Sequence, residues 1–311
     1  MLKKNYVVLF FIFFVFGLYA SEISDKDKKQ ENKNVYSVEL PKQVELGDFF
    51  SVKFSADNKI EKAWITIFNP EKKEVQKINA FSVNDEHKEM AAVAVAAVWW
   101  KLGKWEIKTS AVINGTLFEE THFCNIAEKK FEEFVMHLNA KNTEIIHKKS
   151  PEKTKQSDKL NSILKMRNME SVFFKGPFKL PFAANRISSG FGEKRTSKFS
   201  NGKVSESRHW GIDYPAPVGT KIAAPGKGKI VLAEKRIVTG WTIVIEHLPG
   251  VYTLYYHLNK IYVKEGSFTE KGTPIGEIGT TGFSTGPHLH WELRINEIPA
   301  DPNLLLTKPL Y

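Results

Sequence analysis

Two histidines lie two residues apart in the segment Thr285–Glu292, which reads Thr-Gly-Pro-His-Leu-His-Trp-Glu. Apolar residues alternate along the chain from there on, which predicts a strand with the imidazoles of His288 and His290 on one face. Such a pair is weak evidence for a site when it stands alone, because histidines on strands are more often surface or packing residues.

Two other segments supply further donors. His209 and Asp213 lie four apart in Arg-His-Trp-Gly-Ile-Asp, and His257 ends a second apolar strand pattern, Tyr-Tyr-His. Imidazole nitrogens and carboxylate oxygens both bind zinc, and a catalytic zinc ion typically takes three protein ligands and keeps one position open. The chain therefore offers one pair of histidines more than a zinc site requires.

In this order, the segments resemble the lysostaphin/LytM-type zinc metallopeptidases, which cleave peptide cross-links in bacterial cell walls. The resemblance covers roughly residues 178–305, and further matching blocks are Ser189–Gly192, Pro217–Thr220 and Gly276–Gly279. It implies a sheet fold whose active-site groove is walled by loops. It also implies zinc as the cofactor, with one ion per chain, and peptidoglycan as the substrate.

The resemblance implies a role for each donor. His209, Asp213 and His290 would be the zinc ligands, whereas His257 and His288 would stay unligated on the open side of the metal. Histidine titrates near neutral pH, so these two could accept the proton of the attacking water, support the oxyanion and protonate the leaving amine. The sequence does not decide which of them is the general base, and it contains no H-E-x-x-H motif that would supply a glutamate instead.

Length and composition fit two folded regions with connecting segments. The chain has 311 residues, and its hydrophobic fraction of 42% is ordinary for a chain with a packed core. The net charge of +10 suggests attraction to anionic wall polymers or lipid headgroups, or serves solubility alone. Cys124 is the single cysteine, so no intrachain disulfide can form, and we expect it to be a small buried hydrophobe in a strand.

Residues 1–20 have the features of a secretory signal peptide: two lysines, the apolar run Val7–Leu18 and a small residue at its end. The short apolar run favours cleavage near Ala20 or Ser21, and the alternative is an uncleaved N-terminal anchor, which would be the only membrane contact. Export would bring the protein to the periplasm or cell envelope, where nucleic acid is not an expected partner. Residues 21–34 are dense in charged side chains and predict a flexible tether.

Residues 35–127 predict a β-sandwich domain, of immunoglobulin-like type. Apolar side chains recur with a period of two in Phe50–Phe54, and Asn114-Gly115 lies between two apolar runs as a hairpin turn. Met90–Trp100 fits either a helix or a buried strand, since periodicity cannot distinguish them. A domain of this kind could bind glycan, hold an envelope regulator as a partner or shield the active site.

Residues 128–177 predict a helical connector. Apolar residues recur at helical spacing in Phe131–Leu138 and again in Leu160–Leu164, with the charged stretch Lys148–Lys159 between them. The plain interpretation is a helix that packs on one of the two domains. The alternative is an inhibitory segment that lies in the active-site groove.

Residues 178–311 predict the LytM-type peptidase domain, which makes the fold class mainly β. Glycine turns separate short strands and no helical period is visible after Asp213, so we expect an antiparallel sheet. The expected strands are Lys221–Ala224, Lys229–Ala233, Trp241–His247, Thr253–His257, Ile261–Lys264 and Thr273–Ile278. The polar insert Lys194–Ser207 predicts a mobile loop at the edge of the groove.

Several residues are left outside the ligand set. Tyr255 either lines the groove or is a half-buried core residue, and His247 is interpreted as a strand-end residue. The remaining histidines lack ligand spacing and are expected at the surface or in packing; they are His87, His122, His137 and His147.

The leading hypothesis is an exported zinc metalloendopeptidase that hydrolyses peptide cross-links or stem peptides of bacterial peptidoglycan in cell-wall remodelling. The alternative is a non-catalytic LytM-type regulator that activates a separate cell-wall amidase, but such relatives lack one or more ligands and all five positions are filled here. A third hypothesis is an adhesin or scaffold with a structural zinc, although structural sites are more often closed by four protein ligands.

Overall fold

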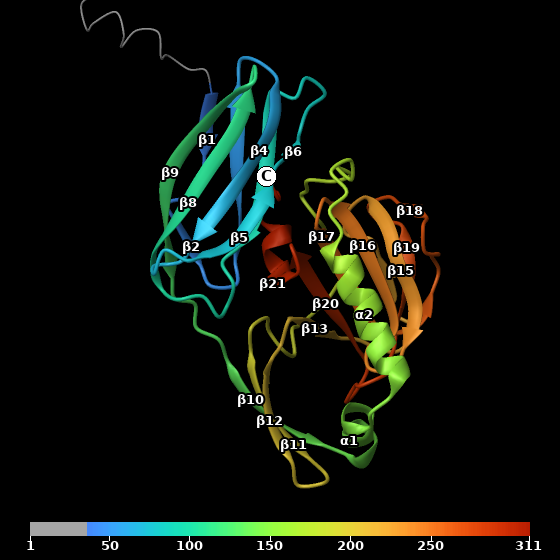
Figure 1. Cartoon of the computed structure of the whole chain (residues 1–311). Coiled ribbons are helices and arrows are strands. Elements are labelled where there is room, and N and C mark those ends of the chain that lie inside the picture. Colours follow the sequence, from blue (N-terminus) through green and yellow to red (C-terminus); the bar gives the residue numbers. More distant parts are fainter. Residues whose placement is uncertain (1–35) are drawn as a thin grey trace, which may run out of the picture. The chain divides into compact units, whose positions relative to one another are not determined.

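The computed structural model describes residues 36–311 (Figure 1). The expected signal peptide and tether, residues 1–20 and 21–34, lie outside the described residues. Within residues 36–311 no helix has both the length and the apolar character that a membrane crossing requires.

The first part of the described chain is built from two sheets. One has the strand order β1-β3-β7-β6 and the other β2-β9-β8-β4-β5. The strands are β1 (Tyr36–Glu39), β2 (Gln43–Glu45), β3 (Phe49–Ala56), β4 (Ile60–Phe68), β5 (Glu74–Asn79), β6 (Phe81–Ser82), β7 (Glu89–Val95), β8 (Gly103–Ile113) and β9 (Thr116–Ala127). Alternate side chains of both sheets, such as Val52, Phe54 and Ile65, share one buried core, which is the arrangement of a sandwich. Its immunoglobulin-like type stays a prediction.

The local predictions for the sandwich can be compared with these strands. The ambiguous segment Met90–Trp100 is mostly strand, because β7 extends to Val95 with nearly every side chain buried. The hairpin turn is confirmed: Asn114 and Gly115 separate β8 from β9, with φ angles of 50° and 71°. Positive φ at both positions is what a two-residue turn of this kind needs. Cys124 is buried in β9, as expected.

The connector contains a strand as well as helices: β10 (Glu133–Leu138), α1 (Ala140–His147) and α2 (Pro151–Lys165). The helix predicted around Phe131–Leu138 is wrong, because β10 pairs in parallel with the strand that begins at Lys194. Helical spacing of four apolar residues was too little signal to reveal a distant partner strand. The prediction for Leu160–Leu164 is confirmed, since these residues lie in α2.

Sequence signals at its start explain where α2 begins. The Ser150 hydroxyl accepts a hydrogen bond from the Lys153 amide, and Pro151 occupies the first helical position. At the other end of the helix, Ile163 and Leu164 pack against Tyr252 and other side chains from one face of the C-terminal sheet. Figure 1 shows α2 lying across that sheet. The plain interpretation of the connector, a helix packed on a domain, therefore holds for α2.

The insert Lys194–Ser207 is a hairpin, so the predicted mobile loop is wrong. Its strands are β11 (Lys194–Phe199) and β12 (Val204–Arg208), and with β10 they form a separate three-stranded sheet. Buried and exposed side chains alternate at the end of β11, where Ser197 and Phe199 are buried and Lys198 is exposed. The polar composition of the segment made this alternation hard to recognise from the sequence. This sheet brings its first residues next to the predicted metal ligands.

The C-terminal part is a nine-stranded sheet in which every pairing is antiparallel, as predicted. The elements are β13 (Gly211–Pro215), β14 (Lys221–Ala223), β15 (Gly228–Arg236), β16 (Gly240–Leu248), β17 (Val251–Ile261), β18 (Phe268–Thr269), β19 (Pro274–Ile278), β20 (His288–Ile295), β21 (Ile298–Ala300) and the 3-10 helix η2 (Pro302–Leu306). The strand predicted at Ile261–Lys264 is wrong, because β17 already ends at Ile261. Strand β20 lies between β13 and β17, and this position sets the site.

Candidate metal centre

Strand pairing brings the predicted donors together. In the register of β13 with β20, Asp213 lies opposite His290, and in the register of β17 with β20, Tyr256 lies opposite His290. His209 comes two residues before β13 begins. Because β20 alternates its side chains, His288 and His290 share the face that the H-x-H spacing predicted.

Three donor atoms form a tight triangle. His209 Nε2 lies 3.0 Å from Asp213 Oδ1 and 2.9 Å from His290 Nδ1, and His290 Nδ1 lies 2.7 Å from Asp213 Oδ1. All three residues are buried, and they form a group able to hold a metal ion. Two imidazoles and one carboxylate are the ligand types of catalytic zinc.

In each of the two histidines one ring nitrogen belongs to the triangle (the inner nitrogen) and the other points away from it (the outer nitrogen). The hydrogen-bond partner of the outer nitrogen fixes the protonation of the inner one. His209 Nδ1 lies 2.8 Å from the carbonyl oxygen of Gly190, which can only accept, so Nδ1 carries the proton. His290 Nε2 lies 3.0 Å from Glu292 Oε1 and donates to that carboxylate in the same way. In the neutral rings, both inner nitrogens therefore present lone pairs to the Asp213 carboxylate and to each other. This convergence of lone pairs and negative charge fits a bound cation.

The electrostatics point the same way. Burial works against the charged form of Asp213, yet the adjacent imidazoles of His209 and His290 hold the pKa of this carboxyl well below its usual range. Burial also lowers the pKa of His290, but Asp213 and Glu292 outweigh it and raise that pKa to about 9. Burial lowers the pKa of His209, which favours its neutral form. The pocket thus draws positive charge to the centre of the triangle.

Two supporting residues were not found from the sequence. Arg195 Nη2 donates to Asp213 Oδ2 at 2.9 Å, while its Nε donates to Glu193 Oε1 at 2.8 Å. Glu292 receives Arg294 Nε at 2.7 Å on the oxygen that does not contact His290. The signal for Glu292 was present, since it continues the period of two from His288 and His290. Arg195 gave no signal, because it lies in the segment predicted to be a loop.

His257 and His288 lie beside the triangle with one nitrogen free. Their Nδ1 atoms donate to the carbonyl oxygens of Thr281 and Gly286, both at 2.8 Å, which leaves Nε2 of each ring unprotonated when the ring is neutral. The two ring centroids are 4.9 Å apart, and His288 Nε2 lies 3.7 Å from Asp213 Oδ1. Burial, with the neighbouring His288 and His290, lowers the pKa of His257 to about 3, so it is a neutral base at ordinary pH.

The backbone of His257 is itself unusual. Its φ angle of 61° lies in the left-handed region, which non-glycine residues seldom adopt. The Thr239 carbonyl holds this conformation by accepting from the His257 amide at 2.8 Å. The kink interrupts the alternation of β17 and turns the imidazole toward His288. Backbone conformations of this kind concentrate at functional sites.

Neighbouring aromatic residues divide between core and site. Tyr255 is fully buried, and its hydroxyl lies 2.8 Å from Thr253 Oγ1, so of the two alternatives it is a core residue and does not line the groove. Tyr256 instead stacks on His290, with ring centroids 5.2 Å apart and planes 2° from parallel. His247 is buried in the strand that ends after it and lies outside the donor group.

The connector reaches the edge of the site. Asn142 Nδ2, in the first turn of α1, donates to the Ser284 carbonyl at 3.2 Å, and Ser284 Oγ lies 3.4 Å from His288 Nδ1. Thr143 Oγ1 also lies 2.9 Å from Ser200 Oγ in the β11–β12 turn. These contacts place part of the connector beside the predicted groove, and its role as an inhibitory segment stays a prediction.

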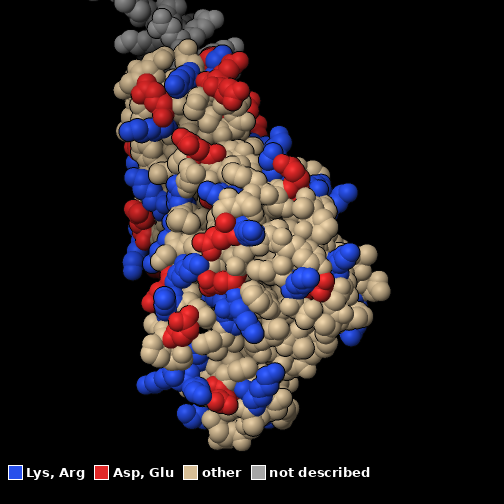
Figure 2. Space-filling model, turned by 90° about the vertical axis from the view of Figure 1, so that its right-hand side faces the viewer, with Lys and Arg blue, Asp and Glu red and all other residues tan. Residues whose placement is uncertain are grey.

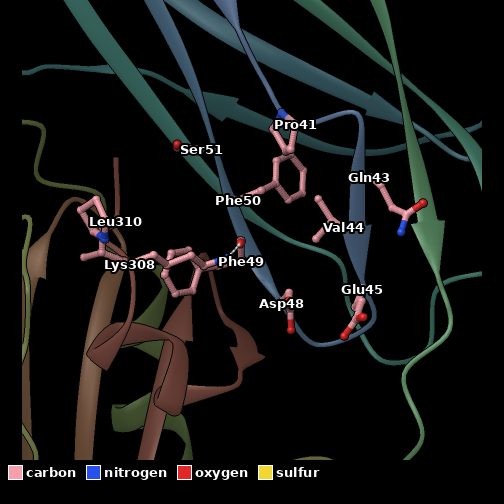
Figure 3. Close-up of a pocket in the computed structure, with 11 residues that line it drawn as sticks. Pro41, Gln43, Val44, Glu45, Asp48, Phe49, Phe50, Ser51, Lys308 and Leu310 are labelled. Atoms are coloured by element: carbon pink, nitrogen blue, oxygen red, sulfur yellow. Dashed lines mark hydrogen bonds between the residues drawn. The ribbon is translucent and has the colours of Figure 1, made fainter.

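A separate cavity of about 540 Å³ lies between β2, β3 and the end of the chain (Figure 3). Lys308 crosses it, donating to the Phe49 carbonyl at 2.9 Å with its ammonium over the Phe49 ring. None of the five predicted site residues lines this cavity. Its position makes it a gap between packed segments rather than part of the candidate metal centre.

Comparisons with known proteins match the part of the chain that contains the candidate metal centre. Residues 207–302, which contain all five predicted site residues, match the model of Peptidase family M23. An uncharacterized metalloprotease of Buchnera aphidicola is 34% identical over 196 residues, covering 61% of this chain and 50% of the relative. The DD-carboxypeptidase/endopeptidase Mpg of Neisseria meningitidis is 41% identical over 129 residues, covering 41% of this chain and 29% of that protein. The chain thus spans half or less of the length of these relatives.

One solved structure resembles most of the described chain. A crystal structure from Pseudomonas aeruginosa, described provisionally as an M23 peptidase, covers 84% of this chain and 93% of its own, with a TM-score of 0.56 and 21% sequence identity. At this identity the similarity extends to the fold alone.

Proposed function

Because residues 207–302 match the model of Peptidase family M23, we propose that this protein is an exported zinc metalloendopeptidase that hydrolyses peptide cross-links or stem peptides of bacterial peptidoglycan. The observation that carries the proposal is the division of five side chains into two sets. Three converge on one point with lone pairs and a carboxylate, and two present a free imidazole nitrogen beside it.

We assign the metal to His209 Nε2, Asp213 Oδ1 and His290 Nδ1. Zinc held there would polarise the scissile carbonyl and lower the pKa of a water molecule to roughly 7. Arg195 and Glu292 support the proposal, because each fixes the orientation of one ligand through a hydrogen bond that is partly buried for Arg195 and buried for Glu292. Such partners orient ligands and tune metal affinity in zinc sites generally.

The two remaining histidines supply the proton transfers. Nε2 of His257 or of His288 takes the proton of the attacking water and later delivers one to the leaving amine nitrogen. Their Nδ1–H groups are held by backbone carbonyls, so the free nitrogen cannot rotate away from the site. The imidazolium that forms next to the oxyanion would also stabilise its negative charge.

The regulator hypothesis is the second candidate function, and the contact between α1 and Ser284 is the observation that favours it. With α1 at Ser284, the edge of the groove is covered, which fits a protein that does not turn over a wall peptide. The presence of all five side chains in hydrogen-bonded positions favours the enzyme, because a non-catalytic protein would not need free nitrogens on His257 and His288.

Export to the periplasm or cell envelope is part of the proposal and follows from the leader-like residues 1–20. The sandwich would then meet envelope partners or the wall itself. Figure 2 shows basic and acidic side chains interspersed over one face, so the positive excess does not gather there into one basic patch. On that face, attraction to anionic polymers has no concentrated site.

The experiment that tests the proposal is digestion of purified peptidoglycan by the zinc-loaded chain, with a chelated sample as control and mass spectrometry of the released fragments. We expect loss of cross-linked dimers and new termini inside the peptide, both abolished by the chelator. Release that continues unchanged after chelation, or fragments cut only in the glycan, would refute a zinc endopeptidase.

A further inference from the structure

A hollow of about 580 Å³ lies next to the candidate metal centre, yet none of the five donors lines it. It is bounded by the turn after β7, by the first residues of β10 and β11, and by the end of β12 with Trp210. Trp210 directly follows His209 in the chain, so the hollow and the metal site are one residue apart along the backbone. Nothing in the reaction proposed above uses this hollow.

Two tryptophan side chains meet in it. The rings of Trp99 and Trp210 lie edge to face, with centroids 6.0 Å apart and an interplanar angle of 86°. Trp99 is 59% exposed, whereas Trp210 is partly buried. An aromatic side chain this large usually contributes to a core or to an interface, and Trp99 makes little use of its ring in the folded chain.

The local structure holds Trp99 in this exposed position. The amide of Trp100 donates to the Ala97 carbonyl at 2.8 Å, which closes a tight turn. On either side of Trp99, Val98 is buried in the core and Trp100 stacks on Trp105 with centroids 4.1 Å apart. Because both neighbours are anchored inward, the turn presents Trp99 to the hollow as a fixed platform.

The charges around the hollow are largely engaged within the protein. Lys194 pairs with Glu133 at 2.7 Å, and Arg208 donates to the Gly192 carbonyl at 2.9 Å while lying over the Phe131 ring. Arg195 contributes to the wall but turns its guanidinium to Asp213. A polyanion would therefore find no concentrated positive charge there. An uncharged ligand with flat apolar faces and polar edges fits better.

We propose that Trp99 and Trp210 form a subsite for the sugar rings of a β-1,4-linked amino-sugar chain, which in the wall is the glycan strand that carries the stem peptides. The C–H faces of the rings pack on the tryptophans, and their hydroxyl and acetamide groups hydrogen-bond to polar side chains of the rim such as Thr196 and Glu206. The proposal rests on the proposed function and deepens it, because it places the glycan beside the centre that cleaves its peptides.

The test uses the full chain in metal-free form, titrated with neutral oligosaccharides of β-1,4-linked N-acetylglucosamine and followed by tryptophan fluorescence and calorimetry. We expect saturable binding that Trp99→Ala weakens about tenfold or more, since aromatic anchors dominate binding where they occur. Trp64→Ala is the matched control. Trp64 is a partly exposed tryptophan on β4 that lies under Lys77, away from the hollow, so its replacement should leave the affinity unchanged.

Each outcome decides the proposal. Absence of binding by the unmodified chain, or equal affinity in the Trp99→Ala protein, would overturn it. Thermal unfolding of the variant checks that it is folded, and Trp99→Phe, which keeps an aromatic face, should retain part of the affinity. Zinc-dependent cleavage of a sugar-free cross-linked peptide is measured separately. If the chain cleaves this peptide but binds no oligosaccharide, the sugar subsite is refuted and the proposed function stands.

Discussion

At the residue scale, the partner of one ring nitrogen fixes the protonation of the other nitrogen in each site histidine. All four site histidines donate one N–H to a carbonyl or carboxylate, and each neutral ring therefore directs one lone pair inward. The difference between a proposed ligand and a proposed base lies in the neighbours of that lone pair. The free nitrogens of His209 and His290 meet Asp213 within 3.0 Å, whereas the free nitrogen of His288 stops at 3.7 Å.

This division predicts opposite behaviour for matched alanine variants. His209→Ala and Asp213→Ala should lose zinc and turnover together, because each removes one of the three proposed ligands. His257→Ala should keep one zinc per chain and lose about 10²- to 10⁴-fold in turnover, the usual contribution of a general acid–base group. Elemental analysis of the purified variants and a peptide-cleavage assay measure both properties. Stoichiometric zinc in either ligand variant, or full turnover in the His257→Ala protein, would contradict the assignment.

Arg195 should act on the metal through Asp213. Arg195→Ala removes the partner of Asp213 Oδ2, so the carboxylate can turn away from the metal, and we expect zinc affinity to fall about 10- to 100-fold. Competition with a chromophoric chelator measures this directly and needs no activity assay. Arg186→Ala, at an exposed arginine of the preceding segment, is the control and should bind zinc normally. Equal affinities in the two variants would remove Arg195 from the site.

At the scale of elements, the pairing of β13 with β20 holds the proposed ligands Asp213 and His290 in register. Gly211 begins β13 at a point of very close approach, where an added methyl group would lie 2.4 Å from the Trp291 carbonyl and 2.8 Å from His290 Nε2. Only a residue without a side chain allows the two strands to pair there. The local sequence Trp-Gly-Ile-Asp therefore contributes to the candidate metal site through its glycine as well as its aspartate.

Gly211→Ala should separate these strands, lower the free energy of unfolding by about 1–3 kcal/mol and weaken zinc binding, as overpacked cores do. Denaturant unfolding and zinc titration measure the two effects. Gly190→Ala is the control, because a methyl group at Gly190 meets no atom within 4 Å and its carbonyl remains available to His209. Normal zinc affinity in the Gly211→Ala protein would show that the register tolerates the added carbon.

Elements also mark the limit of what the sequence could predict. The C-terminal strands were predictable because glycine turns and alternation are local signals, and the five donors lay in recognisable local segments. Strand β10 was not predictable, because its partner β11 lies about sixty residues further on and both segments look polar or weakly helical in isolation. Arg195 was missed for the same reason, because its contact with Asp213 depends on the pairing of β11 with β10.

At the scale of the whole molecule, stability should depend on pH through His247. This residue is fully buried against the Phe178 ring, and its two nitrogens contact the Lys227 carbonyl and Thr253 Oγ1. Burial lowers its pKa to about 4, against about 6.5 for an unperturbed histidine. Between pH 4 and pH 6.5, His247 is therefore protonated in the unfolded chain and neutral in the folded chain.

The stability that His247 contributes is complete above pH 6.5 and declines as the pH falls toward 4, by about 3 kcal/mol in total. Denaturant unfolding of metal-free protein over this range measures the slope. His247→Gln should make the slope shallower and leave the part that the buried His257 contributes, whereas His137→Gln, at an exposed histidine, should leave it as in the parent chain. Identical slopes in all three proteins would mean that His247 is not the titrating group.

The account as a whole depends on turnover at one zinc ion, and a titration tests this most directly. Metal-free chain receives increasing zinc while cleavage of a sugar-free, cross-linked stem-peptide dimer is followed by mass spectrometry. We expect the cleavage rate to rise in proportion to zinc up to one ion per chain and then to level off. A chain that binds one zinc ion and still leaves the peptide bond intact would contradict an active enzyme, and would leave the regulator or a chain inhibited by its connector.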